Sequence, residues 1–212
     1  MTFFSRAFTA GLAALALASA APAPAGINHG GGGGGGDPAL PGYTQIHLPT
    51  LASSWTGTIG MDTGYPIDNG ASGIDIQDSF AGGRHMAYYD FSPGATEIQQ
   101  FVVTLTPKNS GQYAQVALYN NATFKVQSVV VDVNACTWQE THQAGSPTNT
   151  GFQVDLLANG RCRVSVWQDM NGGSGSEVYV AISDSAHPTY TSDAPSFVGN
   201  GTHTITVFPS GT

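Results

Sequence analysis

The sequence predicts an all-β protein, an antiparallel β-sandwich of jelly-roll or immunoglobulin-like general architecture with one disulfide. Short runs rich in β-branched and aromatic residues recur along the second half of the chain and are separated by turn residues. After residue 42, no window repeats apolar residues at the spacing of a helix. The chain contains two cysteines, an even number, as expected of a secreted protein with a disulfide.

The N-terminal part of the chain predicts secretion. Residues 1–20 have the features of a signal peptide: Arg6 supplies positive charge, and the apolar run that follows is too short to span a bilayer and ends in small residues. Residues 21–42 are rich in Ala, Pro and Gly and predict a disordered linker, because such a segment buries no side chains. Residues 43–212 are then expected to form a single β-sandwich domain outside the cell.

Seven runs in the second half predict strands. Asn159-Gly160 is a strong hairpin signal, and the glycine-rich turn 171–176 is expected to join neighbouring strands in the same way. Trp167 and Tyr179, on either side of that second turn, would then form an outward aromatic platform. The predicted strands are Gln100–Thr106, Tyr113–Tyr119, Phe124–Val133, Phe152–Ala158, Arg161–Gln168, Glu177–Ser183 and His203–Pro209.

The two cysteines are expected to form the disulfide. Cys162 shares one face of its predicted strand with Val164 and Val166, so its side chain points inward. A secreted chain folds in an oxidising compartment, where paired cysteines persist. We therefore expect Cys136 and Cys162 to be bonded.

Two short patterns predict N-linked glycans. Asn121 begins the acceptor Asn-Ala-Thr, and Asn200 begins the acceptor Asn-Gly-Thr. Both occur in turn-like contexts, where acceptors are exposed. Both asparagines are therefore expected to be glycosylation sites.

The charge balance restricts the partners. The formal net charge is −8 at pH 7, and only 9% of residues are charged. Nucleic acids and anionic membrane surfaces need clustered cations, so neither is an expected partner. No segment after the N-terminal apolar run is apolar enough to span a membrane. Glycans or an extracellular protein remain as expected partners.

The acidic segment from Asp62 to Asp90 is the predicted ligand site. It is rich in glycine and shows little alternation before Met86, so we expect solvated loops whose carboxylates contribute little to folding. Sugars stack on aromatic rings, and their hydroxyls bind Asp and Arg. Alternation places Tyr88 and Tyr89 on opposite faces, so one of the two belongs to the core. The candidate ligand-binding residues are Asp75, Asp78, Arg84, Tyr88, Tyr89 and Asp90.

The same segment offers candidate metal ligands. Asp75, Asp78 and Asp90 carry the carboxylate oxygens that Ca²⁺ prefers, although their spacing is not that of an EF-hand loop. We therefore expect no obligatory cofactor, and calcium is the alternative.

Residues Gly73–Asp78, GIDIQD, resemble the E-I-D-I-x-E strand of the laminarinase-like glycoside hydrolases, which are β-sandwiches. In that family two carboxylates of the motif flank the sugar bond as nucleophile and acid. Gly73 occupies the position of the nucleophile, and the shorter Asp78 occupies that of the acid. Asp75 matches the assisting aspartate.

The leading functional prediction is a secreted, extracellular, non-catalytic protein that acts in binding or as a surface component, with glycans as its ligand. No catalytic residue is assigned under this prediction. One alternative is a carbohydrate-active hydrolase or lyase that uses residues 62–90. Another is a small secreted effector that binds a host protein through an apolar surface.

Overall fold

The structure is a computed structural model, and its described part is nearly all β. The predicted signal peptide, 1–20, and the predicted linker, 21–42, lie outside the described residues except for Gly42. Among the described residues there is one short 3₁₀-helix, Ala52–Ser54, and no α-helix, which confirms the predicted fold class. The described stretches are 42–70, 73–93, 98–170 and 175–209.

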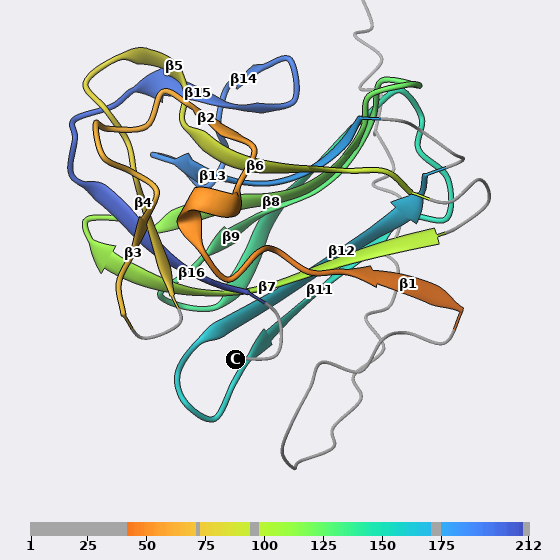
Figure 1. Cartoon of the computed structure of the whole chain (residues 1–212), viewed down its shortest axis with the longest axis horizontal. Helices are drawn as coiled ribbons and strands as arrows, with labels where there is room; N and C mark the ends of the chain where they lie inside the picture. Colours follow the sequence, from red (N-terminus) through yellow and green to blue (C-terminus); the bar gives the residue numbers. More distant parts are fainter. Residues whose placement is uncertain (1–41, 71–72, 94–97, 171–174, 210–212) are drawn as a thin grey trace, which may run out of the picture. The chain divides into compact units, whose positions relative to one another are not determined.

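Two large sheets carry the fold, and both are drawn in Figure 1. The first, sheet A, is antiparallel except for β1 (Tyr43–Ile46), which pairs in parallel with one end of the long strand β7. In order across the sheet, its other strands are β11 (Gly151–Leu156), β12 (Cys162–Asp169), β7 (Ile98–Asn109), β16 (His203–Pro209), β4 (Ile74–Gln77) and β3 (Ile67–Asp68).

The second large sheet, sheet B, is entirely antiparallel. A smaller sheet, sheet C, has three strands: β14 (Tyr190–Thr191), β15 (Ala194–Val198) and β5 (Gly82–Arg84). The strands of sheet B, in order, are β10 (Thr137–Ala144), β9 (Lys125–Asp132), β8 (Tyr113–Asn120), β13 (Ser176–Ser183), β6 (Met86–Phe91) and β2 (Gly57–Ile59).

The main core follows from strand alternation. Phe101, Val103 and Leu105 of β7 belong to the same buried cluster as Val116 of β8 and Val180 of β13. Alternate residues of a strand point to opposite faces, so each sheet contributes one apolar face to the interior. The two sheets therefore enclose a shared core in a sandwich-like arrangement.

The disulfide closes this core at one end. Cys136 and Cys162 are bonded, as expected, and lie 26 residues apart in sequence. Cys162 is fully buried at the start of β12, on the same face as Val164 and Val166. The inward direction predicted from alternation is thus confirmed.

A second, smaller cluster lies on the opposite face of sheet B. It contains Met86, Ala117 and Tyr179, and Ala194 of β15 packs against them. The residue that follows each of these three in its strand belongs to the main core: Ala87, Leu118 and Val180. The side chains of the second cluster therefore point away from the main core. Sheet C therefore covers part of the outer face of sheet B.

The chain between β12 and β13 does not form the expected hairpin. β12 lies in sheet A next to β7 and β11, whereas β13 lies in sheet B between β8 and β6. Trp167 and Tyr179 therefore belong to different sheets, and the predicted aromatic platform does not exist. A glycine-rich turn shows that the chain changes direction, but it does not specify which strand the following strand pairs with.

The expectation that the acidic segment is a set of loops is also wrong for its centre. Residues Ile74–Gln77 form β4, which pairs with β16 and with β3. Ile74 and Ile76 are fully buried in the main core. The apolar alternation of this strand spans only two residues, so it is easily missed in the sequence.

Candidate functional site

A hollow of about 280 Å³ opens on the outer face of sheet B, beside the turn that joins β14 and β15. Side chains of three neighbouring strands line it: Tyr88 of β6, Glu177 of β13 and Tyr119 of β8. The register places Glu177 directly opposite Tyr119 on one side and opposite Asp90 on the other. The hollow therefore combines two phenol rings with a carboxyl group.

The strands place these side chains by alternation. Ala87, Leu118 and Val178 are fully buried in the main core, and each precedes or follows a residue of the hollow. Tyr88 and Tyr119 pack beside the second cluster. Tyr88, Tyr119 and Glu177 thus stand on paired strands of a sheet rather than on a loop.

Arg84 and Asp193 form one wall of the hollow. An Nη atom of Arg84 lies 3.0 Å from a carboxylate oxygen of Asp193, and both side chains are largely buried. The carbonyl oxygen of Asp193 accepts hydrogen bonds from the Tyr179 hydroxyl, at 2.7 Å, and from the Gln115 amide, at 2.9 Å. These bonds join the β14–β15 turn to the sheet, so the wall has a fixed position.

Glu177 is the chemically unusual residue of the hollow. The pKa of its carboxyl is raised from the ordinary value of 4.5 to about 7, chiefly by burial. The negative charges of Asp90 and Asp193 contribute to this rise, and Arg84 opposes it. Near neutral pH, Glu177 therefore exists in both protonation states and can donate or accept a hydrogen bond.

The phenol of Tyr119 remains protonated. Burial raises the pKa of Tyr119 above its ordinary value, and the charges of Asp193 and Glu177 add to this effect. Burial also raises the pKa of Tyr179, which lies fully buried behind the hollow. Tyr119 therefore presents a neutral ring with a hydroxyl that can both donate and accept.

Some of the predicted ligand-binding residues lie at the hollow and others lie elsewhere. Arg84 and Tyr88 line the hollow, and Asp90 is the exposed neighbour of Glu177 across the strand pair. Tyr89 points the other way and packs on the main core, as expected for one of the two tyrosines. Three of the six predicted residues thus lie at or next to the hollow.

Asp78 lies elsewhere and is bonded within the fold. Its carboxylate is fully buried and accepts hydrogen bonds from the backbone N–H groups of Asn200 and His203, both at 2.9 Å. The His203 ring is also 2.8 Å from this carboxylate. The expectation of a solvated carboxylate with little structural role is wrong for Asp78, because its oxygens hold the chain leading into β16.

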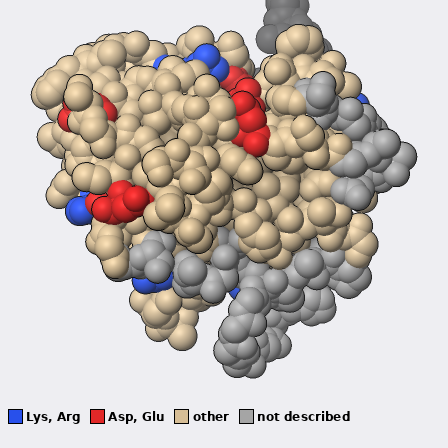
Figure 2. All heavy atoms as spheres, viewed as in Figure 1, with Lys and Arg blue, Asp and Glu red and all other residues tan. Residues whose placement is uncertain are grey.

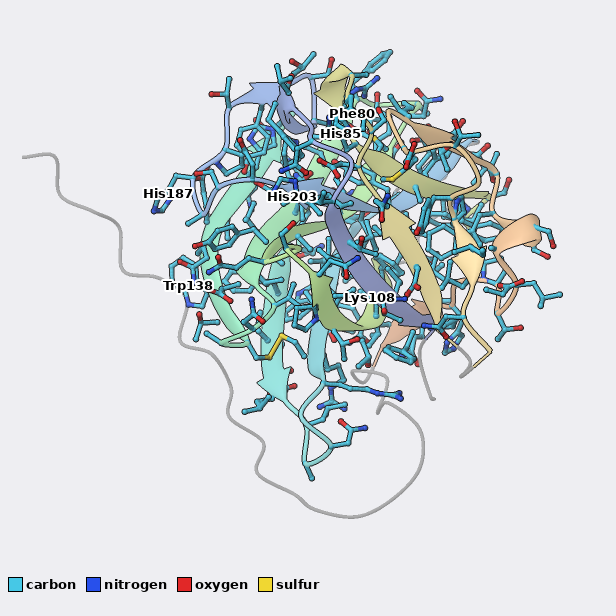
Figure 3. All side chains as sticks on the ribbon, turned by 90° about the vertical axis from the view of Figure 1, so that its left-hand side faces the viewer. Phe80, His85, Lys108, Trp138, His187 and His203 are labelled. Carbon is cyan, nitrogen blue, oxygen red and sulfur yellow. A yellow bond between two sulfur atoms is a disulfide. The ribbon has the colours of Figure 1, made fainter. Side chains whose placement is uncertain are left out.

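Asp75 is also buried and bonded. Its carboxylate lies 2.5 Å from Lys108 Nζ and accepts hydrogen bonds from the Thr206 hydroxyl, at 2.6 Å, and from the Asn69 amide, at 3.1 Å. Figure 3 shows Lys108 and His203, the partners of the two aspartates, on the same side of the molecule. The expectation of a solvated loop carboxylate is therefore wrong for Asp75 as well.

The predicted calcium ligands are not brought together. Asp75 is in sheet A, Asp78 follows it near β16, and Asp90 is at the end of β6 in sheet B. Within the described stretches, no group of three or more His, Cys, Asp or Glu side chains is placed so that it could hold a metal ion.

Glu177, Tyr119 and Asp193 were not among the residues predicted for the site. Alternation within the predicted strand 177–183 does place Glu177 and Tyr179 on one face. The missing information was the position of β13 between β8 and β6, since only that order brings Glu177 beside Tyr119 and Tyr88. No local pattern in the sequence encodes this order.

The surface outside the hollow is sparsely charged. Figure 2 shows mostly uncharged atoms on the face that it presents, with acidic groups in separate patches. The two predicted glycosylation acceptors, Asn121 and Asn200, are both exposed. The described residues include no helix with the length and apolar character needed to cross a membrane.

The fold defines the protein as an all-β, sandwich-like protein with one disulfide. No protein-family model matches the sequence, and a comparison with curated proteins gives no match.

Proposed function

We propose that this protein is secreted and binds neutral glycans in the hollow on the outer face of sheet B. The observation that carries the proposal is the meeting of Tyr88, Tyr119, Glu177 and the Arg84–Asp193 pair in one open hollow. The signal-like N-terminal sequence and the disulfide support secretion, because disulfides persist in oxidising compartments.

The two tyrosines suit the faces of a sugar ring. Carbohydrates present C–H groups that pack on aromatic rings, while the phenol hydroxyl remains available for hydrogen bonding. Gly57 lies opposite Tyr88, and a Cβ atom there would be only 2.6 Å from the Tyr88 hydroxyl oxygen. The absence of a side chain at Gly57 therefore lets the Tyr88 ring lie against β2.

The charges favour a neutral glycan. Glu177 and Asp193 line the hollow, Asp90 is next to it, and Arg84 is already paired with Asp193. With a net charge of −8 for the chain, an acidic sugar would meet net repulsion. The hydroxyls of a neutral sugar can instead bond to the carboxyl groups of the hollow.

A glycan array followed by calorimetry tests this proposal. Replacing Tyr88 or Tyr119 by alanine should weaken binding of the selected neutral oligosaccharide by about tenfold or more, the loss of roughly 1.4 kcal/mol. Tyr113→Ala is the matched control, because Tyr113 begins β8 and does not line the hollow. If the array selects no glycan, or if the three variants bind alike, the proposal is wrong.

Glycoside hydrolysis is a second candidate function, favoured by the Glu177–Asp90 pair. Residues directly opposed on antiparallel strands have Cβ atoms about 5 Å apart. Retaining glycosidases hold two carboxyl groups about 5–5.5 Å apart, one as acid and one as nucleophile. The raised pKa of Glu177 suits the acid that protonates the leaving oxygen, and Asp90 would attack the sugar carbon. Water would then release the sugar and restore both groups.

The two candidates separate in one assay. An enzyme releases new reducing ends from the oligosaccharide that it binds, and Glu177→Gln abolishes this release while binding persists. A binding protein leaves the oligosaccharide intact. Asp90→Asn tests the nucleophile, because the amide cannot form the glycosyl ester.

A further inference from the structure

The side chain of Asn121 is part of the rim of the hollow. Asn121 directly follows β8 in the turn to β9, two positions after Tyr119, and it is exposed. Its amide nitrogen lies 3.5 Å from the position that a Cβ atom on Gly175 would take. A distance of 3.5 Å is ordinary van der Waals contact, so the amide nitrogen of Asn121 lies beside Gly175, just before β13.

The turn that carries Asn121 is held by its neighbour. The buried Asn120 donates a side-chain hydrogen bond to the carbonyl of Met170, and its side-chain oxygen accepts from the backbone N–H of Thr123, at 3.2 Å. These bonds fix the turn on both sides of Asn121. The direction in which a group attached to Asn121 leaves the surface is thereby restricted.

Asn121 is also the first residue of the acceptor Asn121-Ala122-Thr123. A glycan is attached through the amide nitrogen of asparagine and is bulky and hydrophilic. We propose that a glycan on Asn121 covers the mouth of the hollow and limits access to Tyr119 and Tyr88. This inference rests on the proposed function only where it concerns ligand binding; the shielding of the two rings is independent of any ligand.

The second acceptor provides an internal contrast. Asn200 lies between β15 and β16, where its backbone N–H donates to Asp78, and its side chain does not line the hollow. Its side-chain oxygen accepts from Thr202 at 2.9 Å in a local turn. A glycan on Asn200 is exposed like one on Asn121 but leaves the hollow open.

The shielding can be measured without knowing the ligand. The protein is produced in a secreting yeast, occupancy of Asn121 and Asn200 is determined by peptide mass spectrometry, and oxidation by hydroxyl radicals is followed at Tyr88 and Tyr119. Thr123→Ala removes the Asn121 glycan and retains the asparagine in the hollow. Thr123→Ser preserves the acceptor, and Asn200→Gln removes the other glycan.

Tyr119 and Tyr88 should oxidise several-fold faster in Thr123→Ala than in the wild type, while Thr123→Ser and Asn200→Gln should resemble the wild type. Equal rates with Asn121 fully occupied would overturn the proposal, as would an unoccupied Asn121 in the secreted wild type. Calorimetry with the neutral oligosaccharide selected on the array gives the second readout, and Thr123→Ala should bind it several-fold more tightly than the glycosylated wild type. An array that selects no glycan refutes the proposed function and leaves the footprinting result intact.

Discussion

Asp78 is fully buried and Glu177 is half-buried, but the described part of the fold supplies hydrogen-bond donors only to Asp78. Asp78 accepts two backbone hydrogen bonds and one from the His203 ring. Among the described residues, the Glu177 carboxyl has no hydrogen-bond partner, and burial together with the charges of Asp90 and Asp193 raises its pKa to about 7. The first carboxylate stabilises the chain around it, whereas the second is left available to a ligand.

The comparison shows that a dense run of acids in a sequence does not locate a site. Asp75 and Asp78 are close in sequence to Arg84 and Tyr88, but their oxygens are committed to Lys108 and His203. A carboxyl that the fold leaves unbonded in a hollow is the better sign of a site, because burying it carries a cost that the fold does not recover.

The largest expected effect is on stability at Asp78. Asp78→Ala leaves two buried N–H groups and the His203 ring without their acceptor, so the free energy of unfolding should fall by about 3 kcal/mol or more. Denaturant unfolding of the wild type and the variant measures the difference. Unfolding midpoints that agree within error would contradict the structural role of this carboxylate.

Glu177→Gln should increase the free energy of unfolding, in contrast to Asp78→Ala, and the size of the increase should depend on pH. The pKa of Glu177 is about 7 in the folded protein, against an ordinary value of 4.5. The folded state thus retains a proton that the unfolded state loses, so stability falls as pH rises from about 4.5 to about 7. Above that range the full penalty persists, about 1 kcal/mol once solvent screening of a half-buried group is considered.

Thermal unfolding at pH 4 and pH 8 checks this expectation. Glu177→Gln should be more stable than the wild type at pH 8 and equal to it at pH 4. Asp90→Asn is the companion variant. It removes a charge that raises the pKa of Glu177, so the difference in stability between pH 4 and pH 8 should be smaller than in the wild type. A variant that is destabilised at both pH values would show that Glu177 supports the fold.

Much of the fold was predictable because strands and turns are local features. β8, β9 and β12 match the predicted runs within one or two residues, and Asn159-Gly160 does join β11 to β12. The inward phase of Cys162 also follows from three residues of its own strand.

The candidate site was only partly predictable, because it depends on which strands become neighbours. Tyr88 and Arg84 were chosen for their chemistry, and both line the hollow. Glu177 lies far from them in sequence. The chain crosses from sheet A to sheet B after β12, and only then does β13 pair with β6. A turn motif specifies a change of direction, whereas packing of the whole sandwich specifies the partner.

The most direct test of the account is a titration of ¹⁵N-labelled protein with a neutral oligosaccharide selected on the array, followed by amide chemical shifts. The proposed function predicts that the largest changes occur at Tyr88, Tyr119 and Glu177, and that the amides of Asp75 and Asp78 change little. Changes confined to Asp75 and Asp78, with none at the hollow, would contradict it.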